Sequence, residues 1–253
     1  MSKITFHAPR GGTGRSLALA NVAVDLAMKQ KRVGIVDLDV EAGGLVEIFG
    51  IPSTKLSGGL IEILKNGNVD LLLPDYVIEL NKILKIKTTI SLFFLPTIVN
   101  SENLQLLEGW PTKMTDEITL KIIDDFWRDF SLDYLLIDSR TGASQWASVA
   151  LSEANLIVLM TRLNRQGLSG CKRLLPQFHA HNIEVLVVGS SVPNPTKNQE
   201  KVQKAMKIMG YKFDHVLPYA EAQAFDETLL VLKSPSSALS KAYSDLADAI
   251  IAK

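Results

Sequence analysis

Short runs of consecutive apolar residues alternate along the chain with segments that have helical periodicity. The apolar runs predict a first strand that starts at residue 4 and a last strand that ends near residue 218. Between them they predict strands at residues 31–39, 90–95, 132–138, 156–160 and 185–188. The periodic segments predict helices at 15–27, 115–130, 197–209 and 238–252, with shorter ones at 45–49 and 57–64. Continuous apolar runs are typical of parallel strands that helices cover on both faces. The pattern predicts one α/β domain over residues 1–253, with a doubly wound, mostly parallel sheet and helices on both faces.

The helix predicted at residues 115–130 has a clear amphipathic pattern. Thr115 is a residue type that caps helix N-termini, and acidic residues follow it in the first turn. The apolar positions recur at helical spacing and share one face. They are Ile118, Ile122, Ile123, Phe126 and Phe130. We expect this face to pack into the core.

Charge gives no general argument for one class of partner. The chain has 253 residues, and its 27 Lys and Arg balance 27 Asp and Glu, so bulk charge does not indicate nucleic-acid binding. A local basic face is predicted on the helix at 197–209, as either a solvated surface or a non-specific contact for the DNA backbone. Its members are Lys197, Lys201, Lys204 and Lys207.

Cysteine usage and hydropathy indicate the cellular context. Cys171 is the single cysteine, so an intramolecular disulfide is excluded, and we expect it to be a packed residue. The chain has no stretch of about 18 uninterrupted apolar residues and no apolar signal region before the first strand. We expect a cytoplasmic protein without membrane contact, associated with the nucleoid if the lysine face binds DNA.

A glycine-rich loop follows the first predicted strand and precedes the first helix. Gly11, Gly12 and Gly14 allow a close approach that a Cβ atom would block. The N–H groups of the loop and the positive end of the helix dipole would together bind phosphate. Ser16 supplies a hydroxyl where a P-loop holds Mg²⁺. The alternative is a tight strand-to-helix turn without a ligand.

Two predicted strands end in carboxylates. Asp37 and Asp39 lie at the end of the strand at 31–39, where alternate residues share a face, and Asp138 ends the strand at 132–138. Ligands of open α/β sheets bind beyond the carboxyl ends of the strands, so Asp37 and Asp39 are predicted to lie near a bound ligand. Asp138 stands where the Walker B carboxylate of a P-loop protein meets Mg²⁺ through water. The alternative for Asp39 is a cap on the following helix.

Three motifs in this order resemble the ParA/MinD-type ATPases, whose deviant Walker A box is Lys-Gly-Gly-x-Gly-Lys-[Ser/Thr]. The matching stretch extends from Arg10 to Ser16, with arginine at both lysine positions. The Asp-x-Asp at 37–39 matches switch I, and residues 138–142 match Walker B and switch II. The resemblance covers nearly the whole chain. It implies a P-loop NTPase-like fold that binds ATP or ADP with Mg²⁺.

The resemblance also implies roles for individual residues. Asp39 would position and activate the attacking water, and Arg10 and Arg15 would also act in catalysis. The nucleotide would be bound by Gly11, Gly12, Thr13, Gly14, Arg15, Ser16, Gly142 and Pro218. The metal would be bound by Ser16, Asp37 and Asp138. Arg140 departs from the family pattern and is either a phosphate or dimer contact or part of a surface ion pair.

The implied function is an ATP-switched homodimer that hydrolyses ATP and positions or partitions a cargo, either DNA or a protein assembly. Arg10 would reach the phosphates of the other subunit, as an arginine finger does. Arg15 has a larger, planar head than lysine, so we expect slow hydrolysis that a partner protein stimulates. Two alternatives stay open: a non-hydrolysing nucleotide-dependent scaffold, and a P-loop metabolic enzyme such as a dethiobiotin-synthetase-like ligase.

Overall fold

The computed structural model describes residues 2–103, 112–221 and 228–253, and eight strands in these ranges form one sheet. The strands are β1 (Ser2–His7), β2 (Val33–Asp37), β3 (Ile78–Glu79), β4 (Leu92–Leu95), β5 (Tyr134–Asp138), β6 (Leu156–Arg162), β7 (Glu184–Val192) and β8 (His215–Pro218). Their order in the sheet is β3-β4-β2-β5-β1-β6-β7-β8. Only the short edge strand β3 pairs antiparallel with its neighbour. The predicted doubly wound, mostly parallel sheet is confirmed.

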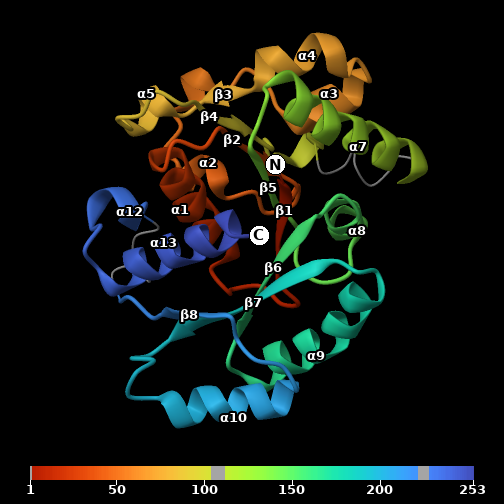
Figure 1. Cartoon of the computed structure of the whole chain (residues 1–253). Coiled ribbons are helices and arrows are strands. Elements are labelled where there is room, and N and C mark those ends of the chain that lie inside the picture. Colours follow the sequence, from red (N-terminus) through yellow and green to blue (C-terminus); the bar gives the residue numbers. More distant parts are fainter. Residues whose placement is uncertain (1, 104–111, 222–227) are drawn as a thin grey trace.

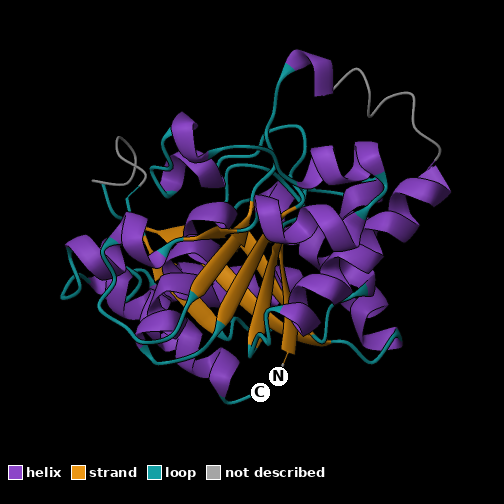
Figure 2. Ribbon diagram, turned by 90° about the horizontal axis from the view of Figure 1, so that it is seen from above, coloured by secondary structure: helices purple, strands orange, loops and turns teal. Residues whose placement is uncertain are grey.

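Helices cover both faces of this sheet (Figures 1 and 2). One face packs against α1 (Arg15–Met28), α2 (Leu45–Ile48), α12 (Leu230–Lys233) and α13 (Ala238–Ile251). The other face packs against α3 (Leu60–Asn66), α4 (Val69–Tyr76), α7 (Thr112–Asp129), α8 (Gln145–Ser152), α9 (Arg165–Ala180) and α10 (Gln199–Met209). The short helices η1 (Ser53–Lys55) and α5 (Asn81–Leu84) belong to the connection between α2 and β4. None of the helices in the described ranges is both long and apolar enough to cross a membrane.

Strand β5 shows why the apolar runs are continuous. Leu136 packs into the core beneath α1 and α13, whereas Leu135 and Ile137 pack into the core beneath α7 and α8. Successive side chains of a strand point to opposite faces, so a sheet that is covered on both sides needs an apolar residue at every position. The parallel register then aligns the strand ends.

The predicted N-cap at Thr115 is wrong, although the apolar face of that helix is as expected. α7 already includes Thr112, and Thr115 lies inside the helix as a buried residue. The backbone carbonyl of Thr115 accepts a hydrogen bond of 2.7 Å from Thr119 Oγ1. An N-cap residue lies before the first helical turn, and Thr115 is therefore excluded from that role.

The carboxyl ends of β1, β2 and β5 meet at one place on the sheet edge. Asp138 of β5 is the register partner of both Asp37 on β2 and Phe6 on β1. β5 lies between these two strands, so the loops that follow all three strands start side by side. Both aspartates that end predicted strands are thus neighbours at the edge where α/β sheets bind ligands.

Candidate functional site

A cavity of about 650 Å³ opens at this edge of the sheet, and the glycine loop forms one end of it. Lining residues from the loop and the start of α1 are Gly11, Gly12, Thr13, Gly14, Arg15 and Ser16. Gly12 and Gly14 have φ angles of 71° and 74°, a left-handed conformation that favours glycine. Gly14 precedes α1 and gives it no side-chain cap, so the first N–H groups of the helix are left for a ligand.

Arg15 is the first residue of α1, and its side chain is only 5% exposed. Its Nε atom donates to Asp138 Oδ1 at 2.5 Å, and its Nη2 atom donates to Asp39 Oδ2 at 2.9 Å. The third nitrogen, Nη1, is buried and has no hydrogen-bond partner among the described residues. One guanidinium therefore joins the phosphate loop to the ends of two strands and keeps one donor free for a further acceptor.

Asp37 and Asp138 are buried carboxylates that are only partly satisfied. Asp37 Oδ1 accepts from the backbone N–H of Asp39 at 3.0 Å, but Oδ2 of Asp37 and Oδ2 of Asp138 have no partner in the described structure. Burial, with the nearby Asp138 charge, raises the pKa of Asp37 well above its usual range. Burial also raises the pKa of Asp138, although Arg15 and the Ser16 hydroxyl favour its charged form.

These residues fit a divalent cation. Asp37, Asp39 and Asp138 face a single guanidinium, so the ionised cluster has two excess negative charges, the charge that one Mg²⁺ balances. The two buried oxygens without partners are hard ligands of the kind that Mg²⁺ prefers. In the described ranges no three His, Cys, Asp or Glu side chains are placed to hold a metal alone.

The segment after β5, which matches switch II in the sequence, is held by a backbone hydrogen bond to the segment after β1. The Gly142 N–H, predicted to meet the γ-phosphate, donates instead to the carbonyl of Ala8 at 3.1 Å, and Thr141 rather than Gly142 lines the cavity. A phosphate contact from Gly142 would require this hydrogen bond to break. Arg140 forms an ion pair with Glu41, which supports the ion-pair alternative for that residue.

His7 lies beneath the same segment, and its ring is a neutral structural group. Its Nδ1 atom is 2.8 Å from Ser139 Oγ, and the hydroxyl donates to the carbonyl of Phe6 at 3.0 Å. Burial, together with the charge of Arg15, lowers the pKa of His7 to about 4. The ring therefore stays uncharged at neutral pH next to the arginine.

The far end of the cavity contains residues that the sequence analysis missed. Pro218 lines the cavity, and Ser190, Ser191, Arg162, Tyr219 and Tyr243 line it as well. The Ser190 hydroxyl is buried without a partner in the described residues, and the Tyr219 side chain is half exposed. A free hydroxyl and an aromatic ring beside apolar walls suit a flat heterocyclic base.

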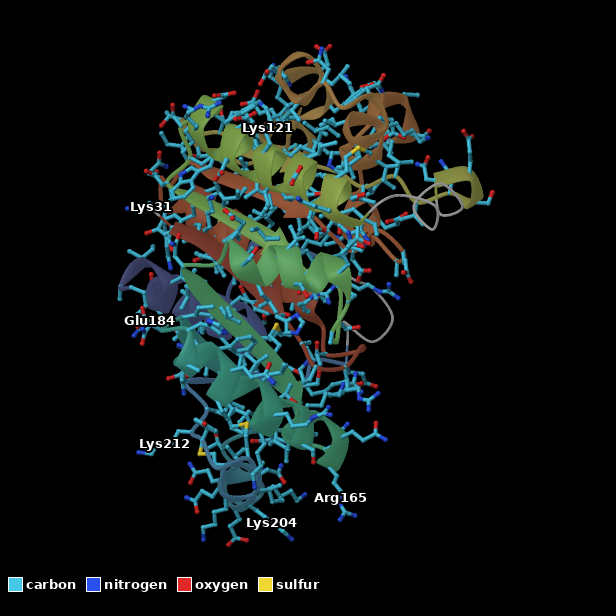
Figure 3. The ribbon with its side chains drawn as sticks, turned by 90° about the vertical axis from the view of Figure 1, so that its right-hand side faces the viewer. Lys31, Lys121, Arg165, Glu184, Lys204 and Lys212 are labelled. Carbon is cyan, nitrogen blue, oxygen red and sulfur yellow. The ribbon has the colours of Figure 1, made fainter. Side chains whose placement is uncertain are left out.

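Several predicted residues do not line the cavity: the buried Asp37 and Asp138, Gly142, Arg10 and the four lysines. Arg10 is exposed and does not line it, so this chain alone does not bring Arg10 to the glycine loop's ligand. Lys197 precedes α10, and the other three lysines are exposed on that helix, opposite buried Val202 and Ala205. Figure 3 shows Lys204 and Lys212 at the end of the molecule that carries α10, far from Lys121. Cys171 is buried, and burial raises its pKa to about 11, as expected of a packed thiol.

Comparison with known proteins agrees with this geometry. A family model described as an AAA domain matches residues 1–185. The flagellum site-determining protein YlxH of Helicobacter pylori is 21% identical over 205 residues, which are 81% of this chain and 63% of that protein. The chain thus spans less than two thirds of that relative's length.

Two solved structures share the fold over their whole length. The MinD cell division protein of Aquifex aeolicus has a TM-score of 0.78 at 16% identity, with 100% of this chain and 98% of that chain covered. The septum site-determining protein MinD of Pyrococcus horikoshii, solved with Mg-ADP, has a TM-score of 0.74 at 20% identity, with 98% and 95% covered. The fold is thus that of solved MinD and ParA proteins, and the chain belongs to the AAA domain family.

Proposed function

We propose that the chain is a slow ATP hydrolase that forms a homodimer when ATP is bound and positions or partitions a cargo. The observation that carries this proposal is the cavity at the edge of a parallel sheet, because the glycine loop, Arg15 and Asp39 line it and contact the buried carboxylates Asp37 and Asp138. The triphosphate would lie on the N–H groups of the loop, and the base would lie between Ser190 and Tyr219. A partner protein would stimulate hydrolysis.

The residues of the cluster divide the work of hydrolysis. Mg²⁺ would be held by Ser16, Asp37 and Asp138, and it would neutralise charge on the phosphates. Asp39, whose side chain is 15% exposed and lines the cavity, would orient the water that attacks the γ-phosphorus. The bond from that phosphorus to the bridging oxygen breaks, so ADP and inorganic phosphate are the products.

Binding is tested by Gly12→Val. A Cβ atom at Gly12 meets no atom within 4 Å, so the added methyl groups would project into the space that the phosphates need. Gly67→Val is a matched control, since Gly67 has a similar φ of 69° at the end of α3, outside the cavity. We expect calorimetry to show a loss of ATP affinity of roughly tenfold or more for Gly12→Val only. Equal affinities for both variants would refute phosphate binding by the loop.

Hydrolysis is tested by Asp39→Ala in single-turnover experiments with Mg²⁺ and ATP. We expect ATP to bind while the rate falls by roughly 10²-fold or more, because the water loses its orienting carboxylate. Glu47→Ala, an exposed carboxylate on α2, is the control and should keep the rate of the wild type. A wild-type rate for Asp39→Ala would show that Asp39 does not orient the water.

The second candidate function is a nucleotide-dependent scaffold that does not hydrolyse ATP. The pairing of Arg15 with Asp39 favours it, because Oδ2 of Asp39 already accepts a hydrogen bond from the guanidinium and is less available to orient a water. Both candidates predict ATP-dependent dimers. The single-turnover rate of the wild type distinguishes them, since a scaffold would hydrolyse no faster than Asp39→Ala.

A further inference from the structure

The β2–α2 loop (residues 38–44) carries Asp39 between Leu38 and Val40, whose side chains are buried in the core. Its start is fixed by a hydrogen bond of 2.9 Å from the Leu38 N–H to the carbonyl of Asp138. Two ion pairs then hold its side chains in the described structure: Asp39 with Arg15, and Glu41 with Arg140. The second pair is exposed, and exposed pairs stabilise weakly. Leu38 and Val40 thus anchor the loop in the core, and the buried Arg15 is the partner that holds the Asp39 side chain between them.

The contact depends on the shape of a guanidinium. Arg15 donates from Nε to Asp138 and from Nη2 to Asp39, so two different nitrogens serve carboxylates that follow two different strands. A lysine has all its donors on one nitrogen. It can bridge two carboxylates, as Lys3 does between Asp124 and Glu153, but it cannot do so through two separate nitrogens while a third faces the cavity. The residue that departs from the P-loop motif is thus the one that makes the link.

The same side chain keeps a donor for a ligand. Arg15 lines the cavity, and its Nη1 atom is buried without a partner among the described residues. A buried N–H group that lacks an acceptor destabilises the ligand-free protein, and a phosphate oxygen would satisfy it. Binding a phosphate in this way does not require Arg15 to release either carboxylate.

We propose that Arg15 is a positioning residue for Asp39: its guanidinium fixes Asp39 against Asp138 before nucleotide binds and contacts phosphate through Nη1. The inference rests on the proposed function for the role of Asp39, but the link itself exists in the ligand-free protein. A consequence distinguishes it from a simple phosphate contact. Arg15→Lys, which restores the lysine of the P-loop motif, should impair the protein instead of improving it.

The first test is hydrogen–deuterium exchange on the ligand-free full chain. We expect Arg15→Lys to raise exchange in the β2–α2 loop by roughly tenfold, while exchange in β6 stays as in the wild type. Arg140→Lys is the matched control, because it makes the same substitution in the other ion pair of this loop. Unchanged loop exchange in Arg15→Lys, an equal rise in Arg140→Lys, or an equal rise in β6 would overturn the proposal.

The second test separates kcat from KM. Lysine keeps a positive charge for the phosphates, so the KM of Arg15→Lys for ATP should stay within about threefold of the wild type, while kcat falls roughly tenfold or more. A kcat at or above the wild-type value would contradict positioning. If the wild type shows no hydrolysis, the proposed function fails, and the exchange experiment still decides the link.

Asp39→Asn provides the same test from the other partner. This substitution weakens the ion pair between Arg15 and Asp39, whose side chain is 15% exposed, and leaves the buried Arg15–Asp138 contact in place. The variant should therefore fold even if Arg15→Lys does not. We expect the same rise in loop exchange. Protection equal to the wild type would show that Arg15 does not hold the loop.

Discussion

Asp37 illustrates how a functional residue can lower the stability of the ligand-free protein. It is fully buried, one of its oxygens has no partner in the described structure, and Asp138 is its neighbour on the next strand. An unsatisfied buried acceptor costs roughly 1–3 kcal/mol, and charge increases that cost. We infer that the cost is maintained because a metal bound with nucleotide would remove it.

The pH dependence of stability tests this inference. The pKa of Asp37 is raised in the folded state, so the folded protein binds this proton more tightly than the unfolded chain does. The contribution of the protonated Asp37 to folding stability is therefore present at low pH. It is lost as the pH rises from the pKa of an unfolded aspartate, about 4, through the raised pKa of the folded state. In EDTA, Asp37→Asn should melt about 2–4 °C above the wild type at pH 8, with a smaller difference at pH 5.

Asp245→Asn, at an exposed position of α13, is the control for the lost charge and should show no such pH-dependent difference. The two variants have the same net charge, so general charge effects cancel. A lower melting temperature for Asp37→Asn at pH 8 would mean that the carboxylate is satisfied in the ligand-free protein and that the metal interpretation lacks this support.

At the scale of elements, the sequence predicted individual strands and helices but missed the side-chain contacts between segments that are distant in the chain. The apolar run of β5 and the helix at Arg15 were predictable because burial on both faces and helical spacing leave local patterns. The partners of Arg15 were not, since Asp39 and Asp138 lie 24 and 123 positions away and no local signal selects them. The base end of the cavity was missed for the same reason, because β6, β7, β8 and α13 each supply part of it.

Helix α10 is the element on which DNA binding depends. Lys201, Lys204 and Lys207 are exposed on it, and a backbone contact would give ATP-bound protein a steep salt dependence for non-specific duplex. Lys204→Glu should weaken binding and lower the salt slope by about one. Lys82→Glu, an exposed lysine of α5 beside the opposite edge strand, is the control. No gel retardation of duplex by the wild type at low salt would leave α10 as a solvated surface.

At the scale of the whole molecule, the position of Arg10 predicts how two subunits meet. A Cβ atom on Gly170 would lie 2.4 Å from Pro9 Cβ, so α9 packs directly against the ring of Pro9, the residue that precedes Arg10. Pro9 is fixed in this way, while Arg10 is exposed and outside the cavity lining. A side chain held there is available to a second subunit, and a contact that needs the γ-phosphate would make dimerisation depend on ATP.

Light scattering with ADP and with a slowly hydrolysed ATP analogue tests this contact. Arg10→Ala should bind ATP within about threefold of the wild type, remain monomeric with the analogue and hydrolyse ATP poorly, because the arginine acts only across the dimer. Arg10→Lys should still dimerise, since a positive charge with hydrogen-bond donors remains. Arg165→Ala, an exposed arginine at the start of α9, controls for the loss of any surface charge near the loop. If Arg10→Ala dimerises with the analogue as the wild type does, Arg10 is a surface residue beside the loop and the subunits meet through other contacts.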